Sequence, residues 1–380
     1  MMIYLDYSAT TPVSFEVLDT FNRTTKEFIG NPNSLHKLGI KSQELIYSAT
    51  KQIADICNIM PREVIYTSSA TEANNLALIG TMLANQHIGK HLIVSKLEHP
   101  SIYKICDYLE SIGFEVSYVD NDEEGLVNFD HLKKLVRDDT VLVSVCSVNS
   151  ETGVRQPLKM IRQIIKKENN NTLLHSDFTQ AIGKVPVNFN DVDLASLSAH
   201  KIFAPKGIGM LYRNEKVKIK PLIYGASKSN ELHPGTPAVA LIASFAKALR
   251  IALTDLEKKE RFVQRLNEKL VKEFSIHKDI LINQTKYSIP HILNISLLNI
   301  KPETFIHALE EKDVYVGTNT ACSSGDLSTS VMAIYNDKKR ATSTIRISIS
   351  HITTSDEINQ FINHFNVCYN NLNNLTTKEG

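Results

Sequence analysis

The sequence predicts an α/β protein with a large domain built on a mostly parallel sheet and a smaller α+β domain. Short runs rich in β-branched and apolar residues alternate with helical patterns through the first half of the chain. Such alternation is typical of a parallel sheet covered by helices on both faces. A helical pattern without proline then runs from 239 to 274, and the remaining chain mixes strands with helices.

We expect the strands of the large domain at residues 64–67, 91–95, 115–119, 141–148, 172–175, 194–198 and 209–212. The helical patterns between them cover residues 43–57, 72–85, 101–112, 130–136 and 158–167. In the smaller domain we expect strands at 292–296 and 345–350 and helices at 303–311 and 355–369. The predicted division assigns residues 13–250 to the large domain, and 1–12 together with 251–380 to the small one.

The amino-acid composition limits the partners and sites that this chain is expected to have. The chain has 42 Lys and Arg against 41 Asp and Glu, so its net charge of +1 predicts no direct nucleic-acid or membrane partner. Its five cysteines form no CxxC pair and no metal-ligand spacing, which favours a reducing cytoplasm and no metal site. The first residues lack the features of a signal peptide, and no apolar run reaches membrane-spanning length.

The segment around Lys201 is the first candidate for chemistry. The apolar run 194–198 ends in Ser198-Ala-His200-Lys201, and the chain then turns through Pro205. A lysine at the carboxyl edge of a buried strand can lose part of its hydration, which lowers its pKa and favours the amine that forms Schiff bases. An ordinary solvated loop lysine is the alternative.

Two further segments also follow predicted strands. Ala70 and Thr71 lie where a helix begins, and small residues at a helix N-terminus can bind a phosphate through backbone N–H groups. An ordinary Ser/Thr cap is the alternative. His99 follows the run 91–95, where an imidazole can stack on a flat ring or move protons near neutral pH. It could also be a loop histidine with satisfied hydrogen bonds.

Asp177 ends another apolar run. A carboxylate there could keep a pyridine nitrogen protonated, and Gln180 could reach a ring substituent. A helix N-cap aspartate is the alternative. Because the carboxyl ends of parallel strands converge on one crevice, we expect these residues to lie together. They would supply a phosphate site, a stacking ring, a pyridinium partner and a Schiff-base lysine, which are the requirements of pyridoxal 5′-phosphate.

The sequence resembles the IscS/NifS-like cysteine desulfurases of the class V aminotransferase group, which implies pyridoxal phosphate fold type I. The matching motifs are YLDYSATTP (4–12), GNPNSLH (30–36), TSSATE (67–72), EH (98–99), VNSETG (148–153), DFTQ (177–180), SAHK (198–201), PKGIG (205–209), GTP (235–237), ACSSG (321–325) and IR (345–346).

The resemblance implies roles for individual residues. Lys201 would hold the cofactor, Asp177 would pair with its pyridine nitrogen, Gln180 would contact its hydroxyl and His99 would stack on its ring. The phosphate would be bound by Ala70, Thr71, Ser198 and His200, with Thr236 reaching in from the other subunit of a homodimer. Asn149 would lie at the cofactor and, with Arg346, hold the substrate carboxylate. Cys322 would be the nucleophile that takes the sulfur, with its thiol deprotonated through His99.

The implied activity converts L-cysteine to L-alanine and passes sulfur as a Cys322 persulfide to an acceptor protein. That acceptor could be an iron–sulfur scaffold, a tRNA-thiolating enzyme or a thiamin-pathway protein. Selenocysteine lyase, a small-amino-acid aminotransferase and a non-catalytic scaffold of the same fold are the alternatives. The small-residue composition around Cys322 is typical of a mobile loop that could deliver sulfur, which speaks against the aminotransferase. The presence of Lys201, Asp177 and His99 speaks against the scaffold.

Two departures from the family pattern concern the entrance of the expected site. His233 stands where relatives commonly carry an arginine, and residues 226–230 lack the glycines and further arginine of relatives. We expect both to affect substrate preference and rate more than cofactor binding.

Overall fold

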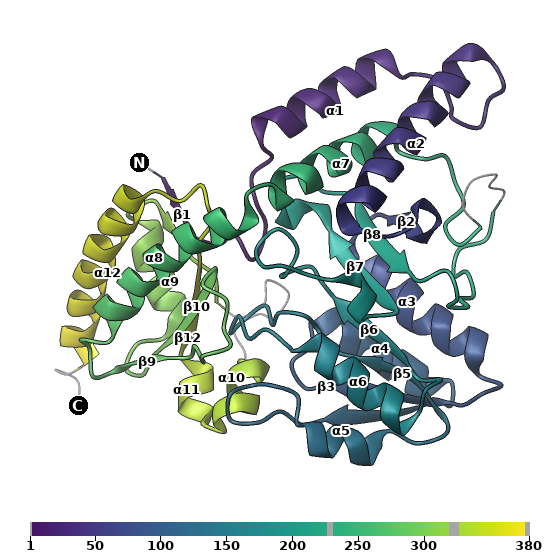
Figure 1. Cartoon of the computed structure of the whole chain (residues 1–380). Coiled ribbons are helices and arrows are strands. Elements are labelled where there is room, and N and C mark those ends of the chain that lie inside the picture. Colours follow the sequence, from purple (N-terminus) through teal and green to yellow (C-terminus); the bar gives the residue numbers. More distant parts are fainter. Residues whose placement is uncertain (1, 226–230, 319–326, 377–380) are drawn as a thin grey trace.

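The computed structural model describes residues 2–225, 231–318 and 327–376, with side chains described to residue 373. The chain forms two lobes that meet along one side (Figure 1). Cys322 and the departure at 226–230 lie outside the described residues.

A seven-stranded sheet forms the centre of the large lobe. Its strands are β2 (Val64–Thr67), β3 (His91–Ser95), β4 (Glu115–Val119), β5 (Thr140–Ser144), β6 (Leu173–Asp177), β7 (Leu194–Ser198) and β8 (Gly209–Arg213), in the order β2-β8-β7-β6-β5-β3-β4. Strands β4, β3, β5, β6 and β7 pair in parallel, and β8 pairs antiparallel with both of its neighbours. The predicted α/β fold with a mostly parallel sheet is confirmed.

Helices cover both faces of this sheet. One face carries α3 (Ala70–Asn85) and α4 (Pro100–Ser111), and the other side holds α1 (Phe15–Glu27), α2 (Lys37–Cys57), α5 (Phe129–Leu135), α6 (Leu158–Glu168) and α7 (Val239–Leu253). Side chains alternate along each strand, so Leu92 and Val94 join the core under α3, while Ile93 joins the core on the opposite face. The sequence pattern missed α1, a largely polar helix that packs on α7.

The predicted strand 141–148 is shorter than expected. Strand β5 ends at Ser144, but the following residues still follow β6, because the N–H groups of Val145 and Ser147 donate to His175 O and Asp177 O at 3.1 and 3.0 Å. This irregular extension carries the chain along the edge where Asp177 lies.

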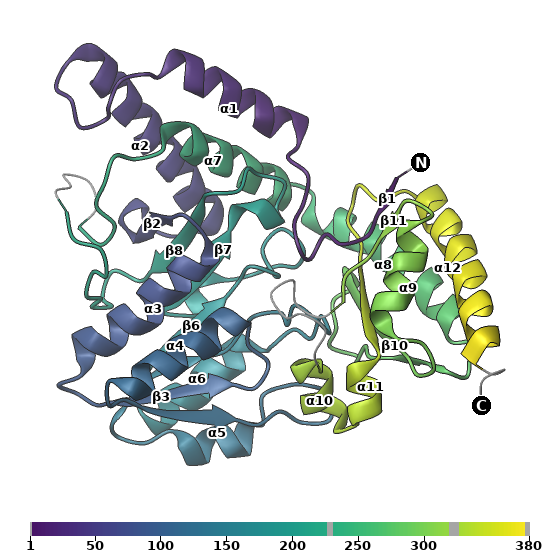
Figure 2. The ribbon, with the colours of Figure 1, turned by 180° about the vertical axis from the view of Figure 1, so that it is seen from behind.

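The small lobe holds a three-stranded antiparallel sheet. Its strands are β9 (Ile280–Ile282), β10 (Ile292–Leu297) and β12 (Thr344–Ser348), with β10 in the middle. Helices α8 (Leu256–Phe274), α9 (Pro302–Glu310), α10 (Thr329–Tyr335), α11 (Lys338–Thr342) and α12 (Ser355–Thr376) complete it. Strand β1 (Ile3–Tyr4) pairs in parallel with β11 (Val314–Tyr315), and the chain then crosses to α1 in the large lobe (Figure 2).

The helical pattern 239–274 is two helices rather than one. Helix α7 ends at Leu253 and α8 begins at Leu256, because Asp255 adopts a left-handed conformation with φ of 53°. The ammonium group of Lys259 donates to Ile251 O at 2.6 Å, which satisfies a carbonyl at the end of α7.

Each lobe has its own hydrophobic core. The core of the small lobe includes Ile3 and Leu5 beside residues of α8, β10, β12 and α12, whereas Val17 and residues of α7 belong to the large lobe. We propose on this ground that the domain boundaries fall between Leu5 and Val17 and at the α7–α8 break. None of the helices in the described parts of the chain is long and apolar enough to cross a membrane.

Candidate functional site

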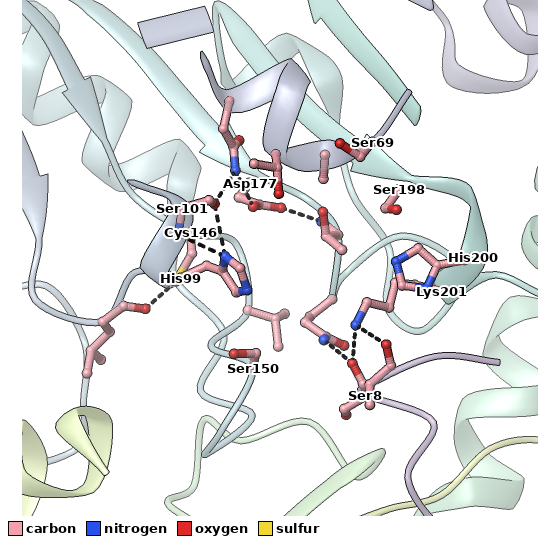
Figure 3. A pocket seen from close by; sticks show the side chains of 18 of the residues that line it. Ser8, Ser69, His99, Ser101, Cys146, Ser150, Asp177, Ser198, His200 and Lys201 are labelled. Carbon is pink, nitrogen blue, oxygen red and sulfur yellow. Dashed lines mark hydrogen bonds between the residues drawn. The ribbon is translucent and has the colours of Figure 1, made fainter. Parts of the chain in front are cut away.

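A cavity of about 230 Å³ opens at the carboxyl edge of the large sheet and is also lined by residues of the small lobe (Figure 3). The site residues predicted from the sequence that line it are Ala70, Thr71, His99, Asp177, Gln180, Ser198, His200, Lys201 and Arg346. The expectation that strand ends would bring these side chains together is therefore met.

Lys201 lies on a single 3₁₀ turn, Ala199–Lys201, directly after β7. Its ammonium group donates to the backbone carbonyls of Ser8 and Ala9, the latter at 2.7 Å (Figure 3). These carbonyls come from the segment that follows β1, so a chain segment that begins in the small lobe orients the lysine of the large one.

Asp177 is the last residue of β6, and its carboxylate is almost fully buried. Its Oδ1 accepts from the backbone N–H of Thr179 at 2.8 Å, and its Oδ2 accepts from Asn74 Nδ2 at 3.0 Å. Two N–H donors therefore hold the carboxylate at the cavity wall.

Gln180 follows one turn later and lies between Lys184 and the Ser8 carbonyl, which Lys201 also contacts. Its Nε2 donates to Ser8 O at 2.9 Å, and its Oε1 accepts from Lys184 Nζ at 2.9 Å. Lys184 is buried, and this burial, with repulsion from Lys201 and Arg346, lowers its pKa to about 7.

Helix α3 begins at the cavity, with Ser69 as its N-cap. Ser69 Oγ accepts from the N–H of Glu72 at 3.2 Å. A Cβ on Gly209 would lie 2.7 Å from both the Ser69 carbonyl carbon and Leu197 O, so glycine there lets the start of α3 lie against the end of β7. The first N–H groups of the helix, those of Ala70 and Thr71, therefore lie beside Ser198 at the cavity.

His200 and His233 flank this helix start. His200 Nδ1 lies 3.1 Å from Thr10 Oγ1, and burial, together with the charges of Lys201 and Lys206, lowers its pKa to about 4. His233, at the position of the family arginine, forms a hydrogen bond through Nε2 with Glu72 Oε1 at 2.8 Å in the first turn of α3.

His99 is the N-cap of α4 and lines the opposite wall. Its Nδ1 accepts from the backbone N–H of Ser101 at 3.1 Å and lies 2.9 Å from Ser101 Oγ (Figure 3). Burial lowers the pKa of His99. The charges of Lys201 and Arg346 lower this pKa further, whereas the charge of Asp177 raises it.

Arg346, in the middle of β12, is the contribution of the small lobe. Its Nη2 donates to Asp6 Oδ1 at 3.0 Å and its Nη1 to Ser150 O at 3.1 Å. Its Nε is buried and has no hydrogen-bond partner in the described structure. Asp6 and Ser150 thus fix the orientation of the guanidinium group at the cavity.

Two predicted residues do not line the cavity. Asn149 is buried, and its amide hydrogens go to Leu97 O and Ser330 Oγ, both at 2.9 Å. Its side chain instead holds the turn that places Ser150 O on Arg346, which explains why it does not contact the cavity. Thr236 is exposed and lines a separate cavity of about 980 Å³ beside Thr67 and Ser68.

The structure adds site residues that the pattern reading missed. Asn74, Ser101, Ser8 and Cys146 line the cavity, and Lys184 lies behind Gln180. Ser8 lies within a motif quoted for the family resemblance. The role of Asn74 is only weakly indicated by the sequence pattern, because a polar residue on the buried side of an apolar helix needs a hydrogen-bond partner.

The four cysteines in the described parts of the chain are buried free thiols. Burial raises the pKa of Cys57 and Cys106 to about 12 and also raises the pKa values of Cys146 and Cys368. They are therefore poor nucleophiles at neutral pH.

Comparison with known proteins identifies the family of this chain. The family described as "Aminotransferase class-V" matches residues 3–361, and the chain belongs to this family, whose members are pyridoxal phosphate enzymes. Its relatives within the family are NifS/IscS-like. The "NifS/IcsS protein homolog" of Lactobacillus delbrueckii subsp. bulgaricus is 37% identical over 98% of this chain and 99% of that protein. "Cysteine desulfurase IscS" of Dictyoglomus turgidum is 36% identical over 94% and 92%.

A solved structure titled "NIFS-LIKE PROTEIN" has the same fold. It superposes with a TM-score of 0.91 at 34% identity and covers 96% of this chain and 98% of its own.

Proposed function

We propose that this chain is a pyridoxal 5′-phosphate-dependent cysteine desulfurase that converts L-cysteine to L-alanine and carries the sulfur as a persulfide on Cys322. The observation that carries the proposal is that Lys201, Asp177, His99 and Arg346 line one cavity, with a helix N-terminus at the same cavity. Family membership and the names of the relatives support the same activity.

The residues present fit the cofactor. Lys201 would carry it, Asp177 would face its pyridine nitrogen, and the start of α3 with Ser198 and His200 would receive its phosphate. The close approach that Gly209 permits between the α3 start and β7 is the expected geometry of a phosphate site. When bound, the cofactor withdraws electrons from the substrate carbon through its ring.

The substrate side of the cavity would be set by Arg346. Its guanidinium group lines the cavity and is oriented by Asp6 and Ser150. A substrate carboxylate in the cavity would pair with guanidinium hydrogens that these two contacts do not use. We do not extend the substrate role to Asn149, because both of its amide hydrogens are already donated within the protein.

Cys322 would receive the sulfur. The other four cysteines are buried and have raised pKa values, so they offer no comparable thiolate. Sulfur transfer to a thiol breaks the substrate C–S bond and forms the persulfide S–S bond on the enzyme. We propose an acceptor protein in the cytoplasm, such as an iron–sulfur scaffold, a tRNA-thiolating enzyme or a thiamin-pathway protein.

We further propose a homodimer in which Thr236 contacts the cofactor phosphate of the second copy. Thr236 is exposed and lies away from the cavity of its own chain. Tyr47, which lines the same cavity as Thr236, exposes its large apolar ring, and Leu35 and Leu38 are exposed at the start of α2. A second copy would cover this surface.

The decisive experiment traps protein-bound persulfide by alkylation after incubation with L-cysteine, followed by mass spectrometry. Wild-type protein should carry the persulfide on Cys322, and Cys322→Ser should carry none while it still binds the cofactor. Lys201→Ala should lose both sulfur release and the borohydride-reduced adduct, which should be present in Lys206→Ala. Persulfide on Cys57, Cys106, Cys146 or Cys368 at wild-type level in Cys322→Ser would refute the assignment.

A further inference from the structure

A continuous chain of hydrogen bonds joins Asp177 to His99. Asn74 Nδ2 donates to Asp177 Oδ2 at 3.0 Å and to Ser101 Oγ at 3.1 Å. Ser101 Oγ in turn lies 2.9 Å from His99 Nδ1. Asn74 comes from the interior of α3 and is 1% exposed, whereas Ser101 and His99 come from the start of α4.

The direction of every hydrogen in this chain can be assigned. A carboxylate only accepts, so Asn74 must turn its NH₂ group toward Asp177. If the amide were turned over, Asn74 Oδ1 would face the carboxylate oxygen, a repulsive contact. Because the second hydrogen of Nδ2 is donated to Ser101 Oγ, the hydroxyl of Ser101 is left to donate its own hydrogen to His99 Nδ1.

His99 Nδ1 is an acceptor for an independent reason. The backbone N–H of Ser101 also donates to it at 3.1 Å, and this hydrogen cannot be reoriented away. A ring nitrogen that receives these donors carries no proton of its own. In neutral His99 the proton must then lie on Nε2, the other ring nitrogen, and the ring itself lines the cavity.

We propose that Asn74 and Ser101 are positioning residues that hold neutral His99 in the Nε2–H tautomer, oriented by the charge of Asp177. The neutral form is the relevant one near pH 7, because burial lowers the pKa of His99. Asp177 thus has a second task beside any contact with a cofactor.

The consequence for catalysis rests on the proposed function. Nε2–H is a donor, so resting His99 presents a proton to the cavity and cannot take one from a thiol at that atom. The hypothesis that His99 deprotonates the Cys322 thiol is then incompatible with the resting tautomer. A neutral imidazole is a very weak acid, so His99 would act through Nε2 as a hydrogen-bond donor to a group in the cavity and not as the base for that thiol.

The alternative is that these contacts only cap helix α4. His99 is its N-cap, and a cap requires the Ser101 N–H bond but neither the serine hydroxyl nor Asn74. The two explanations differ in what happens to the imidazole when the hydroxyl and the amide are removed.

The test measures the ring nitrogens of His99 directly in the full-length protein labelled with ¹⁵N-histidine, with and without pyridoxal phosphate. Two-bond ¹H–¹⁵N correlation spectra distinguish protonated from unprotonated nitrogens, and His99→Gln identifies the resonance among the 13 histidines. Wild-type protein should show a protonated Nε2 and an unprotonated Nδ1 near neutral pH.

The variants are Ser101→Ala and Asn74→Leu, with Ser101→Thr as the conservative rescue. Loss of a donor to Nδ1 should raise the pKa of His99 by roughly half a unit or more and shift the Nδ1 resonance. Ser101→Thr should return both values to those of wild type. Matched controls are Ser111→Ala on α4 and Asn75→Leu on α3, whose side chains bond locally to Tyr108 O and Thr71 O.

A protonated Nδ1 in wild type would overturn the proposal. The proposal would also be overturned if the His99 pKa and Nδ1 resonance of Ser101→Ala fell within the range of the control variants. If Asn74→Leu does not fold, the Ser101 variants decide alone. Because the spectra do not depend on turnover, a protein without desulfurase activity but with the predicted tautomer would refute the proposed function and leave this inference standing.

Discussion

Lys184 donates a hydrogen bond to Gln180 Oε1 at 2.9 Å in a part of the large lobe where both side chains are buried. Because the Ser8 carbonyl on the other side can only accept, the Gln180 amide must turn Nε2 toward Ser8 and Oε1 toward Lys184. Its NH₂ end must face Ser8 O and the cavity. A cofactor group that meets Gln180 would therefore have to be an acceptor, as a ring phenolate oxygen is.

The first prediction concerns the stability cost of this buried lysine. The pKa of Lys184 is about 7 in the folded protein, below its ordinary value of 10.5. Between pH 7 and 10.5 the side chain is therefore protonated in the unfolded chain and largely neutral in the folded protein. Stability should therefore rise with pH from 7 to 9 in wild type. In Lys184→Met the increase in the free energy of unfolding between pH 7 and pH 9 should be smaller by about 1–2 kcal/mol. Urea denaturation of the cofactor-free protein measures this increase. The exposed Lys159→Met is the control, and a wild-type slope in Lys184→Met would contradict the prediction.

The second prediction concerns Glu98. Its Oε1 accepts from Ser95 Oγ and Cys146 N at 2.7 and 2.6 Å, and its Oε2 is buried without a partner in the described structure. Burial, helped by the charge of Asp177, raises the pKa of Glu98 from 4.5 to about 8. The folded protein therefore holds a proton that the unfolded chain releases, and stability should fall as pH rises between these values.

Glu98→Gln keeps the acceptor for Ser95 and Cys146 but has no titrating group. Relative to wild type it should gain at least about 1 kcal/mol of stability between pH 5 and pH 8. Thermal or urea denaturation at several pH values measures this gain, with the exposed Glu110→Gln on the same segment as control. Parallel stability curves for wild type and Glu98→Gln would show that Glu98 is ionised in the folded protein.

The third prediction concerns substrate capture. If Arg346 holds the substrate carboxylate, Arg346→Lys should raise KM for L-cysteine by roughly 10-fold or more, because a lysine cannot keep the contacts to Asp6 and Ser150 while it offers a planar donor pair. The value of kcat should change less, since the carboxylate is bound in both ground and transition states. Arg155→Lys, outside the cavity, is the control. A fall in kcat at unchanged KM would assign Arg346 a different task.

The fourth prediction concerns the dimer. Lys201→Ala and Thr236→Ala chains should each be poorly active, and mixing them should restore part of the activity, because a mixed dimer contains one complete site. Sedimentation of the same mixtures should show dimers. Mixing Lys201→Ala with Lys201→Met chains is the negative control. A fully active monomer, or no recovery in a verified mixed dimer, would contradict the shared site.

Some site residues could be predicted from the sequence because their positions follow directly from the neighbouring strand. Lys201 and Asp177 could be placed because each follows an apolar run, and parallel strands deliver their carboxyl ends to one edge. Asn74 and Lys184 could not, because their roles depend on contacts between elements rather than on spacing within one. The break between α7 and α8 was missed for a similar reason, since a left-handed Asp255 leaves no strong signal in a helical pattern.

The crossing of the N-terminal segment between the lobes has a consequence for how the protein is made. Ser8, which bonds Lys201 through its carbonyl, also donates its N–H to Ser348 Oγ, 340 residues further along the chain. Asp6 meets Arg346 across the same separation. Residues 6–8 therefore cannot make these contacts until β12 has been synthesised, and contacts this distant in sequence form slowly. During synthesis the large lobe can fold around its sheet, but the cavity wall that orients Lys201 should be completed only after residues 346–348 have left the ribosome.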